Sequence, residues 1–182
     1  MVKSLTGAVA AVRIERVTAP RLDAIDRRLL LLLSKDGRRA GSDLARQLGL
    51  SRQAVAERIR DLERRGLVRG YTAEVDPALL GLSVRAHIRL ALDTKAGSKG
   101  EKDVVKQLAA NPMVRSVHRV SGEDCFVVQL VCRRIEDVNG VLAELQKTRA
   151  ILSSRTAFVL ETLVEKGAFG ALDESLLPEE PR

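Results

Sequence analysis

Residues 42–59 are Ser42-Asp-Leu-Ala45-Arg-Gln-Leu48-Gly49-Leu-Ser51-Arg-Gln-Ala-Val55-Ala-Glu-Arg-Ile59, and their spacing is typical of two short helices joined by a tight turn. The small side chain of Ala45 lets the second helix cross close to the first, and Gly49 can adopt a positive φ at the turn. Val55 and Ile59 face back onto the first helix. A helix-turn-helix of this kind places its second helix in the major groove of DNA. The alternative is an ordinary helical hairpin in a core.

The charge of the chain is concentrated on the segment that holds this motif. Of the formal net charge of +7, residues 21–70 carry 13 Lys and Arg against 7 Asp and Glu, whereas residues 71–166 carry 14 against 12. A phosphate-facing surface requires such a local excess of positive charge. Only 2% of the residues are aromatic and there is no Trp, which argues against a base-stacking platform for single strands.

The cysteine and histidine pattern predicts neither a disulfide nor a metal site. Cys125 and Cys132 lie in one strand-like run, so they would be about 23 Å apart if extended, whereas a disulfide needs Cα atoms within about 7 Å. His87 and His118 are the only histidines, and no metal-ligand spacing is present. We therefore expect no metal or cofactor other than a small-molecule effector.

The apolar segments of the chain are short. Leu29–Leu33 is a five-residue apolar run, far too short to span a bilayer, and residues 1–20 lack a clear signal-peptide core and cleavage site. We therefore expect a cytoplasmic protein.

Helix signals follow one another through the N-terminal part. Asp23 is expected to cap a first helix that runs to about Lys35, Ser42 to cap a second, and Ser51 to cap a third that ends near Arg65. Residues 67–75 are expected to be extended, as a wing or strand tail. The predicted organisation is an N-terminal extension (1–20), the helix-turn-helix domain (21–66), a strand linker or hinge (67–80), a second domain (81–166) and an acidic tail (167–182).

The second domain has the order strand, helix, strand, strand, helix, strand. Residues 82–92 alternate with a period of two, helical spacing follows at 100–110, and strands are expected at 114–120, 125–133 and 151–164 around a helix at 135–147. This order predicts a ferredoxin-like βαββαβ domain, so the fold class is α+β. The central strands are apolar on both sides, so the second face must also be covered. A partner subunit is the simplest cover, because no segment of the chain is long enough to cover it as a loop.

The order of motifs resembles the leucine-responsive/AsnC family of bacterial and archaeal transcription regulators over about residues 21–166. The residues that carry the resemblance are Leu22-Asp23-x-x-Asp26, Gly37-Arg38, Leu44-Ala45, Leu50-Ser51, Val55-x-x-Arg58-Ile59, Leu62-Glu63-x-x-Gly66, Gly70-Tyr71, Asp76-Pro77 and Leu80-Gly81. The resemblance implies a dimer that binds double-stranded DNA, is often assembled further into tetramers or octamers, and responds to small amino acids.

The first turns of the third helix are the expected base-reading region. Ser51, Arg52 and Gln53 are the candidates for contacts with bases or phosphates, because Arg can pair bidentately with guanine and Gln with adenine. The expected phosphate contacts, which set register without reading sequence, come from Arg58, Arg60, Arg64 and Arg69. Each of Ser51, Arg52 and Gln53 could instead be an ordinary solvated residue.

Arg58, and a further candidate, Arg38, have structural alternatives. Arg58 could brace the domain through Glu57, Asp61 or Asp23 rather than touch a phosphate. Arg38 could contact backbone phosphate or cap the C-terminal end of the first helix.

The turn Ser121-Gly122-Glu123-Asp124, with Cys125 after it, is the candidate effector site. Free backbone N–H groups could hold an effector carboxylate, and a side-chain carboxylate its ammonium group. The family often has Gly-x-x-Asp followed by an aromatic residue; Gly122 and Phe126 fit, but Cys125 stands at the Asp position, so Asp124 or Glu123 would substitute. The alternatives are a plain polar turn, and for Cys125 either an oxidation-sensing or an inert buried thiol.

These features favour a sequence-specific regulator of transcription that is tuned by a small ligand. The alternative within DNA binding is a chromatin-like protein that coats DNA with little sequence preference. An enzyme is disfavoured, and no catalytic residue is expected, because no nucleophile stands beside a base and no phosphate-binding loop is present.

Overall fold

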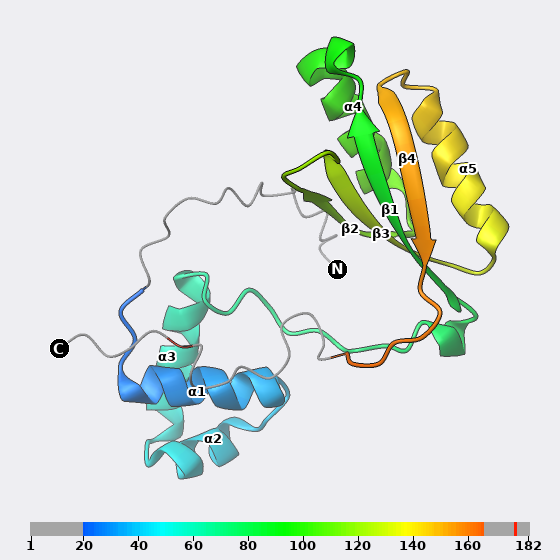
Figure 1. The fold of residues 1–182 in the computed structure, drawn as a ribbon. Helices are drawn as coiled ribbons and strands as arrows, with labels where there is room; N and C mark the ends of the chain where they lie inside the picture. The colour runs from blue at the N-terminus through cyan, green and yellow to red at the C-terminus, as the bar shows by residue number, and fades with distance from the viewer. Residues whose placement is uncertain (1–19, 166–176, 178–182) are drawn as a thin grey trace, which may run out of the picture. The chain divides into compact units, whose positions relative to one another are not determined.

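The computed structural model describes residues 20–165 and residue 177, and Figure 1 shows the helices and strands. The predicted extension before residue 20 and nearly all of the predicted acidic tail lie outside the described residues. The chain divides between Ala73 and Glu74 into two compact units. None of the helices in the described part of the chain is long and apolar enough to cross a membrane.

The first unit contains three helices, α1 (Ala24–Lys35), α2 (Gly41–Leu48) and α3 (Arg52–Arg64). Asp23 caps α1, because its Oδ1 accepts from the Asp26 N–H over 2.7 Å. Gly49 ends α2 in the left-handed conformation with φ 67°, and its N–H donates to the Ala45 carbonyl. The helix-turn-helix predicted from the sequence is therefore present.

The start of α2 differs from the prediction that Ser42 caps it. The helix begins at Gly41, and the Ala40 carbonyl accepts from the N–H groups of Asp43 (2.9 Å) and Leu44 (3.1 Å). Because these bonds fix the first turn one residue earlier, Ser42 lies inside the helix and Ala40 occupies the cap position without a side-chain hydrogen bond.

The core of the first unit is aliphatic and lies between the three helices. Ala45 is buried where α2 meets α3, as its small size predicted. The buried members of this cluster are Leu22, Leu29, Leu30, Leu44, Ala45, Val55 and Leu62.

Residues 67–76 form no strand in the described chain, so the expected wing or strand tail is not seen. Leu67 and Val68 instead close onto the helices: both N–H groups donate to the Leu62 carbonyl, over 2.9 and 3.2 Å, and both side chains pack against the core of the first unit. A strand needs a neighbouring strand for its backbone groups, and the sheet of the described residues belongs to the second unit.

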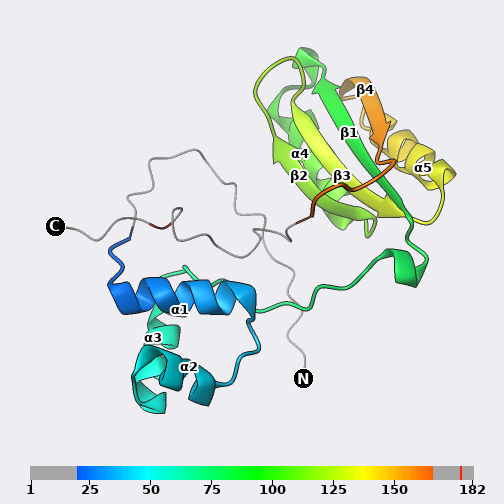
Figure 2. The same ribbon diagram turned by 60° about the horizontal axis from the view of Figure 1, so that its bottom comes forward.

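The second unit is an antiparallel four-stranded sheet with two helices. Its elements are β1 (Val84–Leu92), α4 (Gly97–Ala110), β2 (Val114–Arg119), β3 (Phe126–Cys132), α5 (Ile135–Gln146) and β4 (Ile151–Phe158). The strand order β2-β3-β1-β4 places the first and third strands in the centre, as the predicted βαββαβ arrangement requires. Figure 2 shows α4 and α5 on the same face of this sheet.

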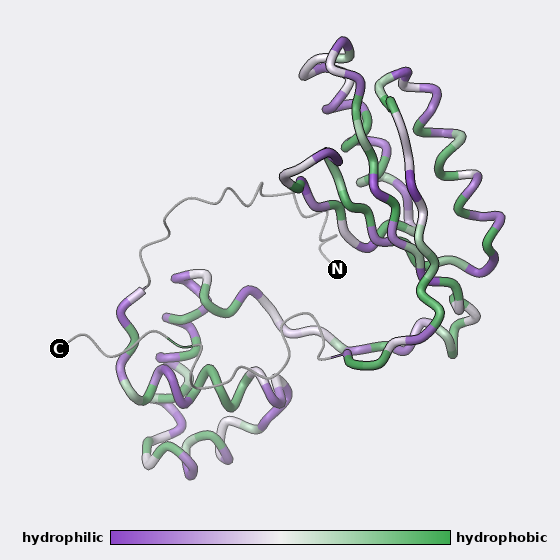
Figure 3. The backbone as a smooth tube through the Cα atoms, viewed as in Figure 1, coloured by the Kyte–Doolittle hydropathy of each residue, from purple (hydrophilic) through white to green (hydrophobic). Residues whose placement is uncertain are grey.

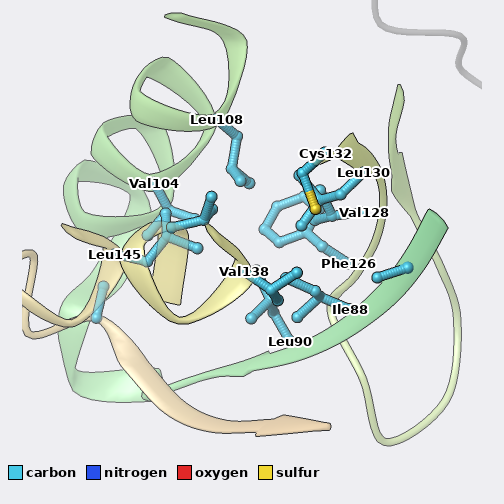
Figure 4. Packing of buried hydrophobic residues seen from close by; sticks show 13 residues of the cluster. Ile88, Leu90, Val104, Leu108, Phe126, Val128, Leu130, Cys132, Val138 and Leu145 are labelled. Atoms are coloured by element: carbon cyan, nitrogen blue, oxygen red, sulfur yellow. The ribbon is translucent and has the colours of Figure 1, made fainter. Parts of the chain in front are cut away.

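The helices bury their apolar sides against the inner face of the sheet. In Figure 4, Val104 and Leu108 of α4 and Leu145 of α5 point toward Phe126 and Ile88 on the central strands. Figure 3 shows hydrophobic and hydrophilic segments alternating along α5, as expected for a helix with one buried side.

The outer sheet face is more polar than the sequence analysis expected. Cross-strand partners share a face, and the register pairs Arg89 with Val127 and Arg155, and His87 with Gln129. Val127 and Val131 of β3 therefore lie beside Arg89 and Arg85 of β1, and Arg155 of β4 lies on the other side of Arg89. The predicted last strand also ends early, at Phe158, because Val159 makes the final backbone bond to β1, from its N–H to the Arg85 carbonyl.

Candidate DNA-binding surface and effector turn

The exposed side of α3 carries side chains that can read or hold duplex DNA. At about 100° per residue, Arg52, Gln53 and Arg60 lie within roughly 100° of one another around the helix axis, and all three are exposed. Gln53 Nε2 donates to Glu57 Oε1 over 3.2 Å. Within the described residues the guanidinium groups of Arg52 and Arg60 have no bonded partner. The opposite side of the helix is buried in the core of the first unit.

The N-terminal end of α3 has features that favour the binding of an anion. Ser51 Oγ accepts from the Ala54 N–H over 3.1 Å, which satisfies one free amide of the first turn. The hydroxyl keeps its own proton, which it can donate to a phosphate. No acidic residue lies in the first turn of α3, so the positive end of the helix dipole has no counter-charge there.

Arg58 lies on the other side of α3 and braces it against α1. Its Nη1 is 2.7 Å from Asp23 Oδ2 and 2.6 Å from Asp26 Oδ1. Arg65, two turns further along, extends the same cluster: it lies 3.8 Å from Asp26 Oδ2 and 3.1 Å from Asp61 Oδ2. This geometry favours the bracing alternative for Arg58. Of the three expected partners, Asp23 binds it, and the buried carboxylate of Asp26 is a second partner.

The brace perturbs the ionisation of both partners. Burial alone would raise the pKa of Asp23, but hydrogen bonds from the Asp26 N–H and from Arg58 outweigh it and lower the pKa below its usual value. The hydrogen bonds to Asp23 and Asp26 raise the pKa of Arg58 above its usual value. The charged forms of both side chains are therefore the stable ones.

The remaining predicted phosphate contacts lie at the surface of the first unit. Arg38 is exposed, and its backbone N–H donates to Asp36 Oδ1 over 2.9 Å. The C-terminal end of α1 is closed by the Asp36 N–H, which donates to the Leu32 carbonyl. Arg64 Nη2 lies 2.5 Å from Asp61 Oδ1 with a side chain that is 75% exposed, and Arg69 is exposed after α3.

The turn between β2 and β3 presents backbone donors. The Val120 N–H donates to the Cys125 carbonyl over 3.1 Å and closes the turn. Gly122 has φ 112°, a conformation that side chains rarely adopt. The backbone N–H groups of residues 121–124 donate to no protein acceptor in the part of the chain that the structure describes. The anion-binding role of Ser121, Gly122, Glu123 and Asp124 stays a prediction.

The two candidate carboxylates at this turn differ sharply. Asp124 is buried, and its Oδ2 accepts from Arg89 Nε over 2.6 Å and lies 2.5 Å from Arg89 Nη2. Glu123 is 89% exposed, and its nearest cation is Arg155, at 3.6 Å. Asp124 is thus already paired, and Glu123 is the carboxylate open to a ligand.

Sequence reasoning missed Arg89 and Arg155 as parts of this site. Arg89 lies 35 residues before Asp124 and Arg155 31 residues after it, so only the strand register brings them together. One sequence feature does point to Arg89. It is one of the polar residues that alternate with apolar ones along 82–92, and this alternation places it on the sheet face opposite the core.

Both cysteines are free thiols. Cys125 is half-buried, and its Sγ accepts from the Leu92 N–H over 3.4 Å. Burial raises the pKa of Cys132. No group of His, Cys, Asp and Glu in the described residues is placed to hold a metal ion.

A capped helix-turn-helix followed by a ferredoxin-like domain is typical of a DNA-binding protein with a separate second domain. Comparison with known families agrees at both ends: residues 22–63 match the AsnC-type helix-turn-helix domain, and residues 85–169 match the Lrp/AsnC ligand binding domain. The chain belongs to the Lrp/AsnC family of transcriptional regulators.

Named relatives and solved structures show the same likeness. The HTH-type transcriptional regulator AldR of Mycolicibacterium smegmatis is 31% identical over 161 residues, covering 88% of this chain and 94% of the relative. The leucine-responsive regulatory protein of Rhizobium meliloti is 32% identical, covering 79% and 92%.

Among solved structures, a transcriptional regulator of Neisseria meningitidis in complex with L-Met has a TM-score of 0.73 at 25% identity, covering 79% of this chain and 93% of that one. AsnC of E. coli has a TM-score of 0.73 at 25% identity, covering 81% and 98%. The families and relatives are regulators rather than enzymes, in agreement with the sequence analysis.

Proposed function

We propose that this transcriptional regulator binds double-stranded DNA sequence-specifically through α3 and is modulated by a small effector, an amino acid, bound at the Ser121–Cys125 turn. The observation that carries the DNA-binding half is the exposed, cationic side of α3, with its capped and uncompensated N-terminus. The names of the relatives favour regulation over the DNA-coating alternative.

The first two turns of α3 enter the major groove in this proposal. Arg52 pairs bidentately with a guanine and Gln53 with an adenine, for which it must release Glu57. Ser51 donates to a phosphate at the helix start. Arg60 supplies a further phosphate contact, which fixes register without reading sequence. Arg38, Arg64 and Arg69 complete the backbone contacts.

The proposed assembly is a homodimer or a larger homo-oligomer formed through the second domain. A dimer spaces two recognition helices against a near-palindromic operator. Its operators lie on chromosomal DNA, so the regulator acts in the cytoplasm. An effector bound at a subunit contact shifts the assembly between arrangements by as much as its affinities for them differ.

The effector proposal rests on the turn and on the ligand-binding family. The backbone N–H groups of residues 121–124, which donate to no acceptor among the described residues, suit a carboxylate, and the related Neisseria meningitidis regulator was solved with L-Met. A screen of amino acids by thermal shift tests this part, because a ligand at 100 times its dissociation constant stabilises a protein by about 2.7 kcal/mol.

DNA binding is tested by measuring affinity for the promoter of the protein's own gene across salt concentrations. Each neutralised phosphate contributes about −0.9 to the slope of log affinity against log salt. We expect Arg60→Gln to reduce the slope by about that amount. Lys106→Gln, an equal charge change on the exposed side of α4, is the matched control and should leave it unchanged. A slope near zero for the unaltered protein would contradict the proposal.

A further inference from the structure

The side chain of Tyr71 attaches the linker between the two units to the first unit. Its hydroxyl donates over 3.0 Å to Oε1 of Glu63, in the last turn of α3. Burial of the ring, together with the hydrogen bond to Glu63 and the charge of that carboxylate, raises the pKa of Tyr71, which keeps the hydroxyl protonated as the donor. The linker is thereby tied to the helix that the proposed function places in the major groove.

Gly37, which follows the end of α1, makes room for the same ring. A Cβ atom at residue 37 would lie 3.1 Å from Cδ1 of Tyr71, which is tighter than ordinary van der Waals contact between carbon atoms. Gly37 does not have a positive φ, so the approach of the ring, rather than the backbone conformation, favours glycine at this position. The docking site of Tyr71 is therefore formed by Gly37 and Glu63.

The residues that follow Tyr71 are not attached to either unit by hydrogen bonds. Residues 72–75 are exposed, and no hydrogen bond joins them to a helix or a strand of the described chain. Hydrogen-bonded structure resumes at Pro77, whose carbonyl accepts from the N–H groups of Leu80 and Leu82. While Tyr71 is docked, residues 72–75 are thus the tether between the two units.

Release of Tyr71 would lengthen this tether. The nearest earlier residue that packs on the core of the first unit is Val68, whose N–H donates to the Leu62 carbonyl. The tether could then extend from residues 72–75 to residues 69–75. Three more extended residues add about 10 Å, or about 20 Å for the two subunits of a dimer. Because duplex DNA rises about 3.4 Å per base pair, this length corresponds to about 6 base pairs.

We propose that Tyr71 is a positioning residue for operator recognition: docked on Glu63 and Gly37, it keeps the tether short and so limits the distances between half-sites that a dimer can span. Tyr71 itself contacts neither bases nor phosphates. Two helix-turn-helix units on short tethers bind half-sites near one favoured spacing, and the effective concentration of the second unit falls when its half-site is moved out of reach. This inference rests on the proposed DNA binding by a homodimer and specifies what sets its tolerance for half-site spacing.

The test measures DNA affinity of the full-length protein as a function of half-site spacing. The probe is the tightest-binding duplex that the unaltered protein selects from a random pool, with versions that carry 2, 4 or 6 extra base pairs at the centre of its footprint. We expect the unaltered protein to lose at least about tenfold in affinity on insertion of 4 base pairs, and Tyr71→Ala to lose less than about threefold. Tyr71→Phe, which keeps the ring and loses the hydrogen bond to Glu63, should lie between them.

Gly37→Ala disturbs the docking site without altering Tyr71. Its added Cβ displaces the ring, so the loss of affinity on insertion should shrink as it does in Tyr71→Phe. Gly41→Ala is the matched control, because a Cβ at residue 41 meets nothing within 4 Å and its φ is not positive; it should keep the spacing dependence of the unaltered protein. The unfolding temperature checks that each variant is folded. If Tyr71→Ala does not fold, Tyr71→Phe and Gly37→Ala carry the test.

The outcomes separate this inference from the proposed function. If Tyr71 only stabilised the first unit, its replacement would lower the affinity for every spacing by the same factor. Such a uniform loss would overturn this inference and leave DNA binding standing, and so would an unaltered protein that binds all spacings equally well. A salt slope near zero for the unaltered protein would overturn the proposed DNA binding together with this inference.

Discussion

Replacement of Arg58 by Met tests whether this side chain braces α3 or contacts DNA. The change keeps an apolar stem of similar length and removes the guanidinium that lies 2.7 Å from Asp23 Oδ2 and 2.6 Å from Asp26 Oδ1. A hydrogen bond to a charged group contributes about 1.5–3 kcal/mol. The bond to Asp26, whose side chain is 11% exposed, belongs at the upper part of that range.

The bond to Asp23 adds less, because that carboxylate is 53% exposed and solvent screens the pair to under about 1 kcal/mol. In the variant, Arg65, at 3.8 Å, is the cation that remains beside the Asp26 carboxylate among the described residues. Since Arg58 is itself 32% exposed, water can reach part of the vacated space. We therefore expect the first unit to lose about 2–3 kcal/mol of unfolding free energy at pH 7.

Urea unfolding followed by tyrosine fluorescence measures this loss. Tyr71 is the single Tyr of a chain without Trp. It packs beside Gly37 and donates from its hydroxyl to Glu63 Oε1 over 3.0 Å, so its emission follows the first unit. Arg60→Met is the control and should change the unfolding free energy by less than about 0.5 kcal/mol.

The salt dependence of DNA binding provides the second measurement. A brace affects the affinity without changing the number of phosphates contacted, so Arg58→Met should leave the salt slope as it is, whereas Arg60→Met should reduce it by about 0.9. A variant of Arg58 that is as stable as the unaltered protein and loses one phosphate from its slope would refute the bracing argument.

Three further predictions concern the same unit. Gly49→Ala should cost about 1 kcal/mol in urea unfolding, because Gly49 has φ 67°, whereas Gly41→Ala, at an open position with negative φ, should not destabilise. The folded-state pKa of Asp23 is lowered from 3.8, so its stabilising contribution is present above about pH 4 and is lost as the pH falls through the folded pKa; Asp23→Asn should flatten the pH dependence of the unfolding temperature in that window, and an unchanged acid profile would contradict this. Gln53→Ala should relax base preference at one operator position by about 1–3 kcal/mol in competition binding with mutated operators, and a uniform loss at all positions would argue against base reading.

Local signals were sufficient to predict most elements of the fold. Caps such as Asp23 and Ser51 act within three residues of themselves, and Gly49 marks a turn because few other residues tolerate its φ. The alternation along 82–92 fixed which side of β1 faces the core. These signals depend only on neighbours in the chain, so a single sequence displays them.

The features that the sequence did not reveal depend on partners far away in the chain. The expected wing at 67–75 is not a strand, because an extended run becomes a strand only if another strand pairs with it. Arg89 and Asp124 meet only through the register of β1 with β3 and the turn that follows β2. The sequence leaves two alternatives for Arg58, since a guanidinium suits either a phosphate or a carboxylate until its neighbours are known.

Asp23 uses both of its carboxylate oxygens, one on the first turn of α1 and the other on Arg58 in the middle of α3. Loss of this carboxylate would therefore loosen the first turn of α1 and the hold on α3 together. In a genetic screen for operator recognition, substitutions of Asp23 would be recovered beside those of Gln53, although this carboxylate is committed within the protein. Such a screen would identify the residues that hold α3 in place as well as those that contact DNA.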